Sequence, residues 1–512
     1  MPACRGQAAI LPGRVHPPLQ TLQALSASRS MKTAPIADRA DRPEFPSPAA
    51  RRPAEARGSS PKRAPSALWV LLLLFVLYNS NLRVIHIDDS VTARLLPFAL
   101  LVKHTIYLDQ WIGPYRATAV GPYKTYFVAP YHGHWVSCYP LALPLVITPL
   151  YVLPAWWFAH LRPLPVPGDI TFMTIVNAME KLSASLLAAL SATLLYLAFR
   201  RIASPAVSLV VALIYAVGSD TWTISSQALW KQDLAELSFA FFLWAMLRST
   251  ERRGYSFLAG LALAVAAANK PPEAIFALLF FFHFLRWPRR SLALYLAPLV
   301  TLGLLTMAYN HHFLGRIWGY YPSPLSPAEQ HAYLHQARSP FGEGLAGLWL
   351  SPNRGLLIYS PWVVFALWGA ARIWKENLYG WGRWLIVGTA LTILGYAQFA
   401  SWWGGWCYGP RNLTDLMPFF AFFLLPVVPR LHTSLPLRAA FVLAVAGALW
   451  VQIVGAYYYP SGWWDGRPIS VDRAPRRLWD FSDTQISRSF LAGPAQPELY
   501  YNCYILLSHR SK

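Results

Sequence analysis

The 512-residue chain has few charged residues and few cysteines. Only 13% of its residues are charged, whereas 55% are hydrophobic. Soluble globular domains carry about 25% charged residues, so this composition argues against a soluble enzyme. The four cysteines show no CxxC spacing, which supports neither a disulfide framework nor a zinc site built from cysteines.

Acidic residues are also scarce, because 23 Asp and Glu face 44 Lys and Arg, for a net charge of +21. Such an excess often indicates a nucleic-acid partner. A nucleic-acid binder would not be this apolar, however, so we expect none. The composition predicts an all-α polytopic membrane protein.

Residues 1–65 contain almost no aromatic residues and no apolar periodicity, and they are rich in Pro, Ala, Ser and Arg. This composition predicts a disordered basic tail. A transit peptide is an alternative, but the prolines and the acids Asp38, Asp41 and Glu44 count against it. A start site placed too far upstream, with Met31 as the true start, is another.

Apolar stretches recur from residue 67 to residue 457, and their order is constrained by charge. They lie at about 67–80, 139–160, 172–199, 205–219, 234–248, 255–268, 272–285, 291–309, 355–373, 384–401, 412–429 and 437–457. Loops rich in Lys and Arg mark the cytoplasmic side of a membrane. If all twelve stretches spanned, the basic loops near residues 200, 250 and 288 would fall outside.

Omitting 139–160 resolves this conflict, because four prolines interrupt that stretch and each interior proline costs a helix about 3 kcal/mol. We therefore expect about eleven transmembrane helices in residues 66–457. The first outer loop would carry interfacial helices, and residues 458–512 would form an outward-facing cap. The segments 81–171, 218–233, 269–273, 310–354 and 402–411 also face outward, so the chemistry is expected on the non-cytoplasmic face.

An acidic pair, Asp88 and Asp89, follows the first apolar stretch and precedes a short amphipathic helix expected over residues 91–102. Carboxylates at a helix start interact favourably with its free N–H groups, which is a structural role. The alternative is catalytic, with one carboxylate acting as a general base that accepts a proton from a hydroxyl.

Other acids have two interpretations each. Asp109 is either a loop residue or a sugar contact. Glu180 and Lys181 point about 100° apart on a helix, so we expect separate partners, either another helix or substrate. Asp220 and Asp233 lie in a loop with Trp222 and Trp230, a mixture suited to sugar binding, although an interfacial aromatic belt explains the tryptophans equally well.

Basic and aromatic residues of the outer segments suggest a phosphate-bearing ligand. Arg354 and Arg411 each begin a predicted span, where a guanidinium and free N–H groups can hold a phosphate. Lys270 either reaches the same phosphate or snorkels to the membrane surface. Trp402 and Trp406 offer faces for stacking on sugar rings. The pair His311 and His312 is weak evidence for a metal.

Several short motifs together resemble a known family. They are IDDSVTARLLPF, YPLALPL, GRIWGYY, SPNRGLLIYSP and GGWCYGPRNLTDLMP, and with the tail they extend the resemblance over residues 66–490. The chain resembles bacterial integral-membrane glycosyltransferases of the C-type fold, a group that includes protein O-mannosyltransferases and lipid A aminoarabinose transferases.

The resemblance implies transfer of a sugar, with inversion, from a polyprenyl-phosphate donor to a lipid, glycan or protein acceptor of the cell envelope. The active face would be periplasmic, on a bacterial inner membrane. It places the base at Asp89 or Asp88, although DD stands where the mannosyltransferases show DE. Its second acidic position corresponds to Asp220 or Asp233. The resemblance leaves a divalent metal cofactor open.

Two other function classes compete with this prediction. A lipid-linked polysaccharide polymerase or ligase uses the same kind of donor, but relies more on Arg and His of a late loop. A transporter or flippase often contains inverted repeats, and this sequence has no recognisable repeat.

Overall fold

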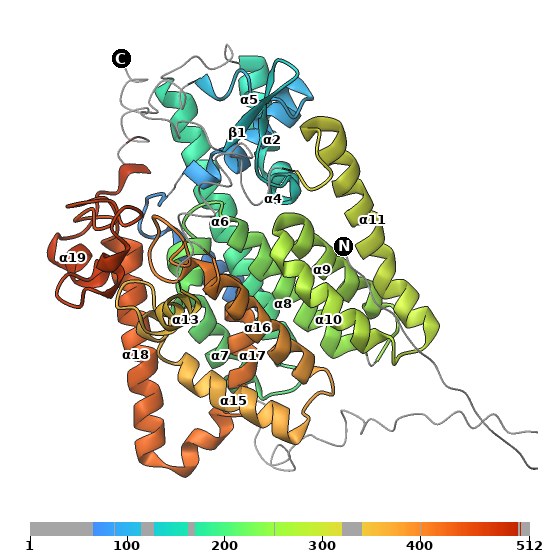
Figure 1. Ribbon diagram of the computed structural model, residues 1–512, viewed down its shortest axis with the longest axis vertical. Helices are drawn as coiled ribbons and strands as arrows, with labels where there is room; N and C mark the ends of the chain where they lie inside the picture. Colours follow the sequence, from blue (N-terminus) through green and yellow to red (C-terminus); the bar gives the residue numbers. More distant parts are fainter. Residues whose placement is uncertain are drawn as a thin grey trace, which may run out of the picture. The chain divides into compact units, whose positions relative to one another are not determined.

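The structure is a computed structural model that describes residues 65–85, 88–113, 127–161, 169–249, 251–319, 340–399, 401–499 and 502. The predicted disordered tail lies outside these residues. The described chain is mostly helical (Figure 1). Its strands form one antiparallel hairpin, β1 (Val128–Tyr131) and β2 (His134–Ser137).

Several helices between residues 67 and 314 pack side by side. α6 (Ile170–Phe199) contacts α8 (Lys231–Ser249), α8 contacts α9 (Tyr255–Asn269), and α9 contacts α11 (Arg289–Leu314). α1 (Ala67–Asn79) and α7 (Pro205–Val217) also pack on α6. Gly260 lets α9 approach α11 closely, because a side chain there would overlap the carbonyl group of Tyr295.

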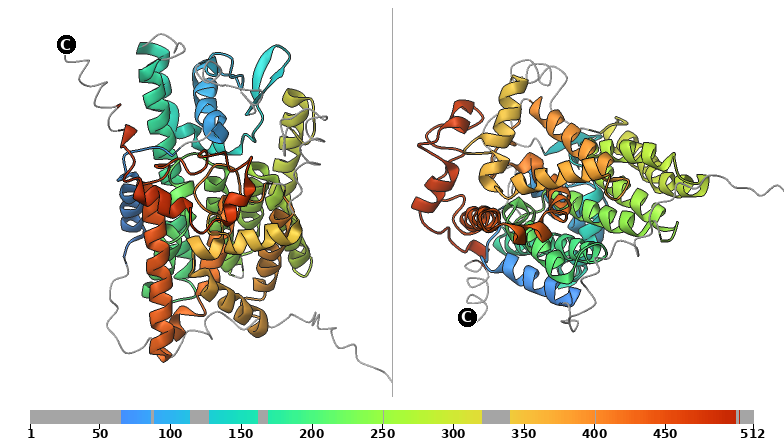
Figure 2. Two further views of the ribbon diagram at one scale, coloured as in Figure 1. Left: turned by 60° about the vertical axis from the view of Figure 1, so that its left-hand side comes forward. Right: turned by 90° about the horizontal axis from the view of Figure 1, so that it is seen from below.

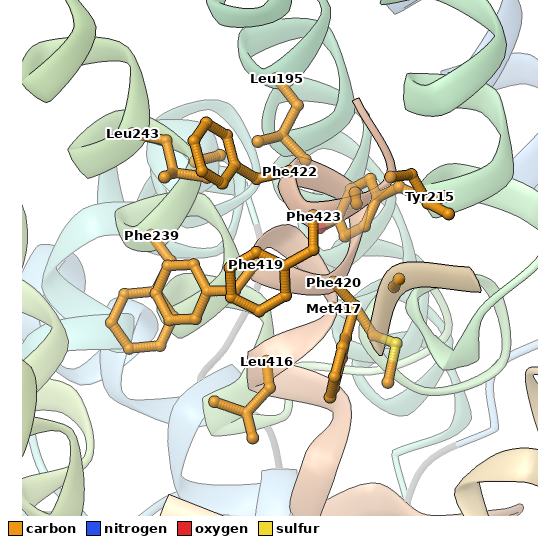
Figure 3. Packing of buried hydrophobic residues seen from close by; sticks show 14 of the residues in the cluster. Leu195, Tyr215, Phe239, Leu243, Leu416, Met417, Phe419, Phe420, Phe422 and Phe423 are labelled. Carbon is orange, nitrogen blue, oxygen red and sulfur yellow. The ribbon is translucent and has the colours of Figure 1, made fainter. Parts of the chain in front are cut away.

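The second half adds shorter helices around a central apolar one. These are α10 (Ala274–Phe284), α13 (Phe341–Leu350), α14 (Leu356–Tyr359), α15 (Val363–Glu376), α16 (Gly382–Ala397), α17 (Met417–Leu424), α18 (Leu435–Tyr457) and α19 (Gln485–Leu491). α17 is buried along its whole length, as expected for a helix that is apolar all round. Figure 3 shows its phenylalanines among Leu195, Tyr215, Phe239 and Leu243.

Four described helices are long and apolar enough to cross a membrane: Ala142–His160, Thr171–Phe199, Arg289–Leu314 and Leu435–Tyr457. The expected number of about eleven spans is not confirmed. Several apolar helices are short, such as α1 and α7 with 13 residues each. At 1.5 Å per residue such a helix covers only about 20 Å of a hydrocarbon core that is about 30 Å thick.

The proline-rich stretch 139–160 differs from the expectation. α4 (Ala142–Ile147), the 3-10 turn η4 (Thr148–Tyr151) and α5 (Val152–Leu161) follow one another without a break, so the prolines do not prevent a helix of spanning length. This run packs mainly on α2 (Val91–Lys103), the confirmed first-loop helix. Figure 1 shows α2, α4, α5 and the hairpin together at one end.

Contacts link the predicted cytoplasmic loops with one another. Arg201 forms an ion pair with Glu251, Arg372 donates a hydrogen bond to the carbonyl of Pro426 (2.7 Å), and Arg286 lies over the ring of Trp384. These contacts join the basic clusters near residues 200 and 250, 288 and 375, and 375 and 430.

Candidate functional site

Asp89 connects the first outer loop to a distant one. Its Oδ1 accepts a hydrogen bond from the Tyr139 hydroxyl (2.6 Å), and its Oδ2 accepts one from Arg411 Nη1 (2.8 Å). The side chains of Asp89 and Arg411 are 15% and 17% exposed, so solvent reaches the pair. Asp88 is more exposed than Asp89. Neighbouring atoms still shield its carboxyl group partly from water, and this desolvation, together with the charge of Asp89, raises its pKa. Of the acidic pair, Asp89 is therefore the one that Arg411 contacts.

Two aromatic rings support the cations around Asp89. Lys231 Nζ lies 4.1 Å from the centre of the Tyr139 ring, and Arg411 Cζ lies 4.5 Å from that of Trp230. Burial lowers the pKa of Lys231 to about 8; Asp89 opposes this shift and Arg411 adds to it. A cation–π contact with an aromatic ring holds a cation in position but leaves its positive charge in place.

Lys270 completes a group of three cations. It forms ion pairs with Asp415 and, at 3.7 Å, with Glu273. Burial lowers its pKa to about 8, and although Glu273 opposes the shift, Lys231 and Arg411 lower it further by repulsion. Asn269 beside Lys270 contacts Lys231, and Gln232 beside Lys231 contacts Arg411. Lys231, Lys270 and Arg411 therefore lie near one another, and we call them the cation cluster.

Hydrogen bonds tie the elements of the cation cluster together. The Asn269 side chain donates to the carbonyl of Lys231 (2.6 Å), and that of Gln232 donates to the carbonyl of Arg411 (3.4 Å). Four segments predicted to face outward, 81–171, 218–233, 269–273 and 402–411, therefore meet at one place.

An apolar groove of about 290 Å³ begins next to the cation cluster. It is lined by Leu194, Leu234, Leu237, Ser238, Phe241, Leu261, Ala262 and Val265, from α6, α8 and α9. Leu234 lies one helical turn beyond Lys231, and Val265 lies one turn before Asn269. Because residues three or four apart share a helix face, Leu234 places one end of the groove next to Lys231. We call it the α8–α9 groove.

Arg354 does not belong to this site. It is fully buried, and its five N–H groups donate to Asp465, Gln485 and the carbonyls of Asn353, Trp403 and Gly405. No N–H is left for a phosphate. The structure places Arg354 in a network that joins the loop before α14 to the loop 401–410 and to the tail.

The tail, residues 458–499, packs against the same two loops. The Gln485 N–H donates to Asn353 Oδ1 (2.6 Å), and the Trp403 indole donates to Asp472 (2.8 Å).

Trp402 is fully buried, whereas Trp406 is 37% exposed. Of the two rings expected to stack on a sugar, only that of Trp406 is accessible to a ligand.

The remaining candidate acids lie inside the protein. Asp220 is fully buried and accepts a hydrogen bond from Gln452 (3.1 Å); burial raises its pKa to about 7, against that hydrogen bond and the charge of Arg354. Asp233 is also fully buried, and no described residue donates a hydrogen bond to its carboxylate. Neither acid is accessible to a ligand at the surface.

Glu180 and Lys181 have separate partners, as their angular spacing predicted. Glu180 forms an ion pair with Arg94 of α2 (2.5 Å), and Lys181 donates to Gln227 (2.5 Å). Glu180 thus anchors the first-loop helix to the bundle. Asp109 has a structural role too, because it accepts hydrogen bonds from the His134 ring and from the Trp135 N–H.

Two residues of the site, Tyr139 and Lys231, were not among the sequence-predicted ones, whereas Trp230 was noted in the loop with Asp220 and Asp233. Lys231 carried a signal, because a lysine at the outer start of a span runs against the preference for basic residues inside. Tyr139 carried none, since its contact with Asp89 depends on the hairpin that precedes it.

Within the described residues, no group of three His, Cys, Asp or Glu side chains is arranged to hold a metal ion. Comparisons of the chain with protein-family models, with curated proteins and with solved structures found no match.

Proposed function

We propose that this protein transfers a sugar from a polyprenyl-phosphate donor to an envelope acceptor on the non-cytoplasmic face of a membrane. The observation that supports this most is the position of the cation cluster, between Asp89 and the start of the α8–α9 groove. The donor phosphate needs cations, its long apolar chain needs an apolar groove, and the acceptor hydroxyl needs a base. The reaction requires these three features side by side.

The donor phosphate would bind the cation cluster. Arg411 retains a free donor, because its buried Nε–H has no hydrogen-bond partner among the described residues. A buried donor left unpaired costs about 1–3 kcal/mol, and a phosphate oxygen would satisfy it. The polyprenyl chain would lie in the α8–α9 groove, whose walls are leucine, phenylalanine, valine and alanine apart from Ser238.

Asp89 would act as the general base. The acceptor oxygen forms a bond to the anomeric carbon from the face opposite the phosphate, and its proton moves to Asp89. The bond between the anomeric carbon and the phosphate oxygen breaks, and polyprenyl phosphate leaves with the electron pair. The cation cluster stabilises the charge that develops on this leaving group.

The ion pair between Asp89 and Arg411 then has a role in the reaction cycle. Arg411 and Tyr139 contact the two carboxylate oxygens of Asp89. A phosphate competes for Arg411 and so frees Oδ2 to accept a proton. Tyr139 stays on Oδ1 and orients the carboxylate.

A pair of adjacent substitutions tests this proposal. A deletion strain would be complemented with the wild type, Asp89→Asn or Asp88→Asn, and envelope glycans would be compared by mass spectrometry. We expect one sugar modification to be lost on deletion and restored by the wild type and Asp88→Asn, but not by Asp89→Asn. Equal amounts of each variant in the membrane are the control. Full restoration by Asp89→Asn would overturn the assignment of the base, and an unchanged glycan profile in the deletion strain would overturn the function.

A further inference from the structure

A second groove lies between the first-loop hairpin and the end of α11. Its volume is about 560 Å³, and it is lined by Tyr107, Tyr131, His132, His311, His312, Phe313 and Gly315. Figures 1 and 2 show the hairpin next to the last turns of α11. The two walls come from segments about 180 residues apart in the sequence. We call this the histidine groove.

The lining indicates the kind of ligand. Among the residues that the structure describes, it contains three aromatic rings and three imidazoles but no Asp, Glu, Lys or Arg. The absence of lysine and arginine from these walls disfavours a phosphate, and the imidazoles disfavour an acyl chain. Aromatic faces pack against the C–H groups of sugar rings, while imidazoles both donate and accept hydrogen bonds. An uncharged saccharide matches this combination.

The walls are held in place by contacts outside the groove. The Tyr107 ring stacks on His134 with 4.0 Å between ring centres, and Asp109 binds the same imidazole (2.7 Å). Gly315 has a φ of +68°, and a side chain there would lie 3.2 Å from the Tyr131 ring. The hairpin and α11 therefore approach closely, which favours a groove that exists before a ligand binds.

The hairpin connects this groove to Asp89. Tyr131 and His134 are paired near the tip, and β2 then leads to Tyr139, whose hydroxyl binds Asp89. At about 3.3 Å per residue, five residues from His134 to Tyr139 span at most about 17 Å. The Tyr139 side chain lies between this backbone position and Asp89, so a saccharide of several units is needed to extend from the groove to the base.

We propose that the histidine groove binds the acceptor through its saccharide chain, several sugar units away from the hydroxyl that reacts at Asp89. The inference rests on the proposed function for the identity of the acceptor. The binding of a saccharide to the groove is independent of catalysis and can be measured alone.

The test uses the full chain in lipid nanodiscs and saturation-transfer NMR. The probes are trisaccharides of glucose, mannose and N-acetylglucosamine, with inorganic phosphate as a fourth. We expect at least one trisaccharide to bind and Tyr131→Ala or His311→Ala to weaken it roughly tenfold, the effect of losing one aromatic or hydrogen-bonding contact. Trp318→Ala is the matched control, since Trp318 is 74% exposed in the same segment but does not line the groove.

The proposal is overturned if no trisaccharide binds, if Tyr131→Ala and Trp318→Ala bind it equally well, or if phosphate alone binds in a way that His311→Ala abolishes. Asp89→Asn should leave trisaccharide binding unchanged while glycan modification is lost. Trisaccharide binding tests the groove and glycan modification tests the proposed function, so a failure of one proposal can be distinguished from a failure of the other.

Discussion

Arg411 Nη1 lies 2.8 Å from Asp89 Oδ2, although 322 residues separate the two in the sequence. The pair joins a group suited to accepting a proton with a group suited to holding a phosphate. A carboxylate paired with arginine is a weaker base, because the cation favours its charged form. Any ligand that attracts the guanidinium therefore weakens this ion pair, so donor binding and the accessibility of Asp89 Oδ2 are coupled through this contact.

Replacing Arg411 tests its role in binding the donor phosphate. Arg411→Gln removes the phosphate contact, and we expect the KM for the lipid-linked donor to rise about 10- to 100-fold, as for the loss of a charged hydrogen bond worth about 1.5–3 kcal/mol. Arg411→Lys keeps the positive charge but not the planar guanidinium, so its KM should lie between those of the wild type and Arg411→Gln. Transfer assays in membranes at varied donor concentration would measure this. An unchanged KM in Arg411→Gln would show that the donor phosphate binds elsewhere.

The proposed site also predicts a dependence on pH. Lys231 has a pKa of about 8, lowered first by burial, compared with about 10.4 for a free lysine. It is charged below this value and neutral above it, whereas a phosphodiester stays anionic throughout. Donor affinity should therefore fall as the pH rises through 8.

Lys231→Arg supplies the control for this dependence, because arginine keeps its charge at every pH of the assay. We expect its donor affinity to fall less steeply than that of the wild type, because only Lys270, whose pKa burial also lowers to about 8, still loses its charge. Lys231→Gln should bind weakly at all pH values. If the wild type and Lys231→Arg lose affinity in parallel, another group is responsible for the change.

The α8–α9 groove can be tested by filling it. Leu237 lines the groove and is partly exposed, so Leu237→Trp should weaken binding of a long-chain donor but not of an analogue with one or two prenyl units. Leu304→Trp on α11 is the control, since Leu304 is 61% exposed and lies outside the groove. Competition with both lipids against a labelled donor would measure the difference. Equal effects of the two substitutions on the long chain would place the lipid elsewhere.

The sequence predicts much of this arrangement at the level of segments. Charge in the loops sorts the segments by membrane side, and the contacts Arg201–Glu251 and Asp89–Arg411 each join segments of one predicted side. The separate partners of Glu180 and Lys181 follow from the angular spacing of helix residues. The helix after Asp89 also forms where the sequence predicts it, although no described side chain caps its start.

The sequence does not show which of the candidate residues are buried, and burial determines which of them a ligand can contact. Arg354 and Arg411 occupy similar positions at the starts of apolar stretches, and nothing local distinguishes them. The tail brings Asp465 and Gln485 to Arg354 from more than 100 residues away and encloses it. Trp402 and Asp233 are likewise enclosed by elements distant in sequence. The count of about eleven spans stays a prediction, since four described helices are long and apolar enough to cross a membrane and the other apolar helices are shorter.

The contrast between the two arginines yields a final prediction. Arg354→Gln leaves Asp465 buried without its cation, and removing one partner of a buried ion pair typically costs about 3–5 kcal/mol. We expect a markedly lower thermal unfolding temperature in nanodiscs, together with an unchanged KM for the donor in the fraction that remains folded. Arg411→Gln should show the opposite, a normal unfolding temperature and a raised KM, because its ion pair is partly exposed. A raised KM without loss of stability in Arg354→Gln would mean that Arg354 leaves its network and contacts the donor.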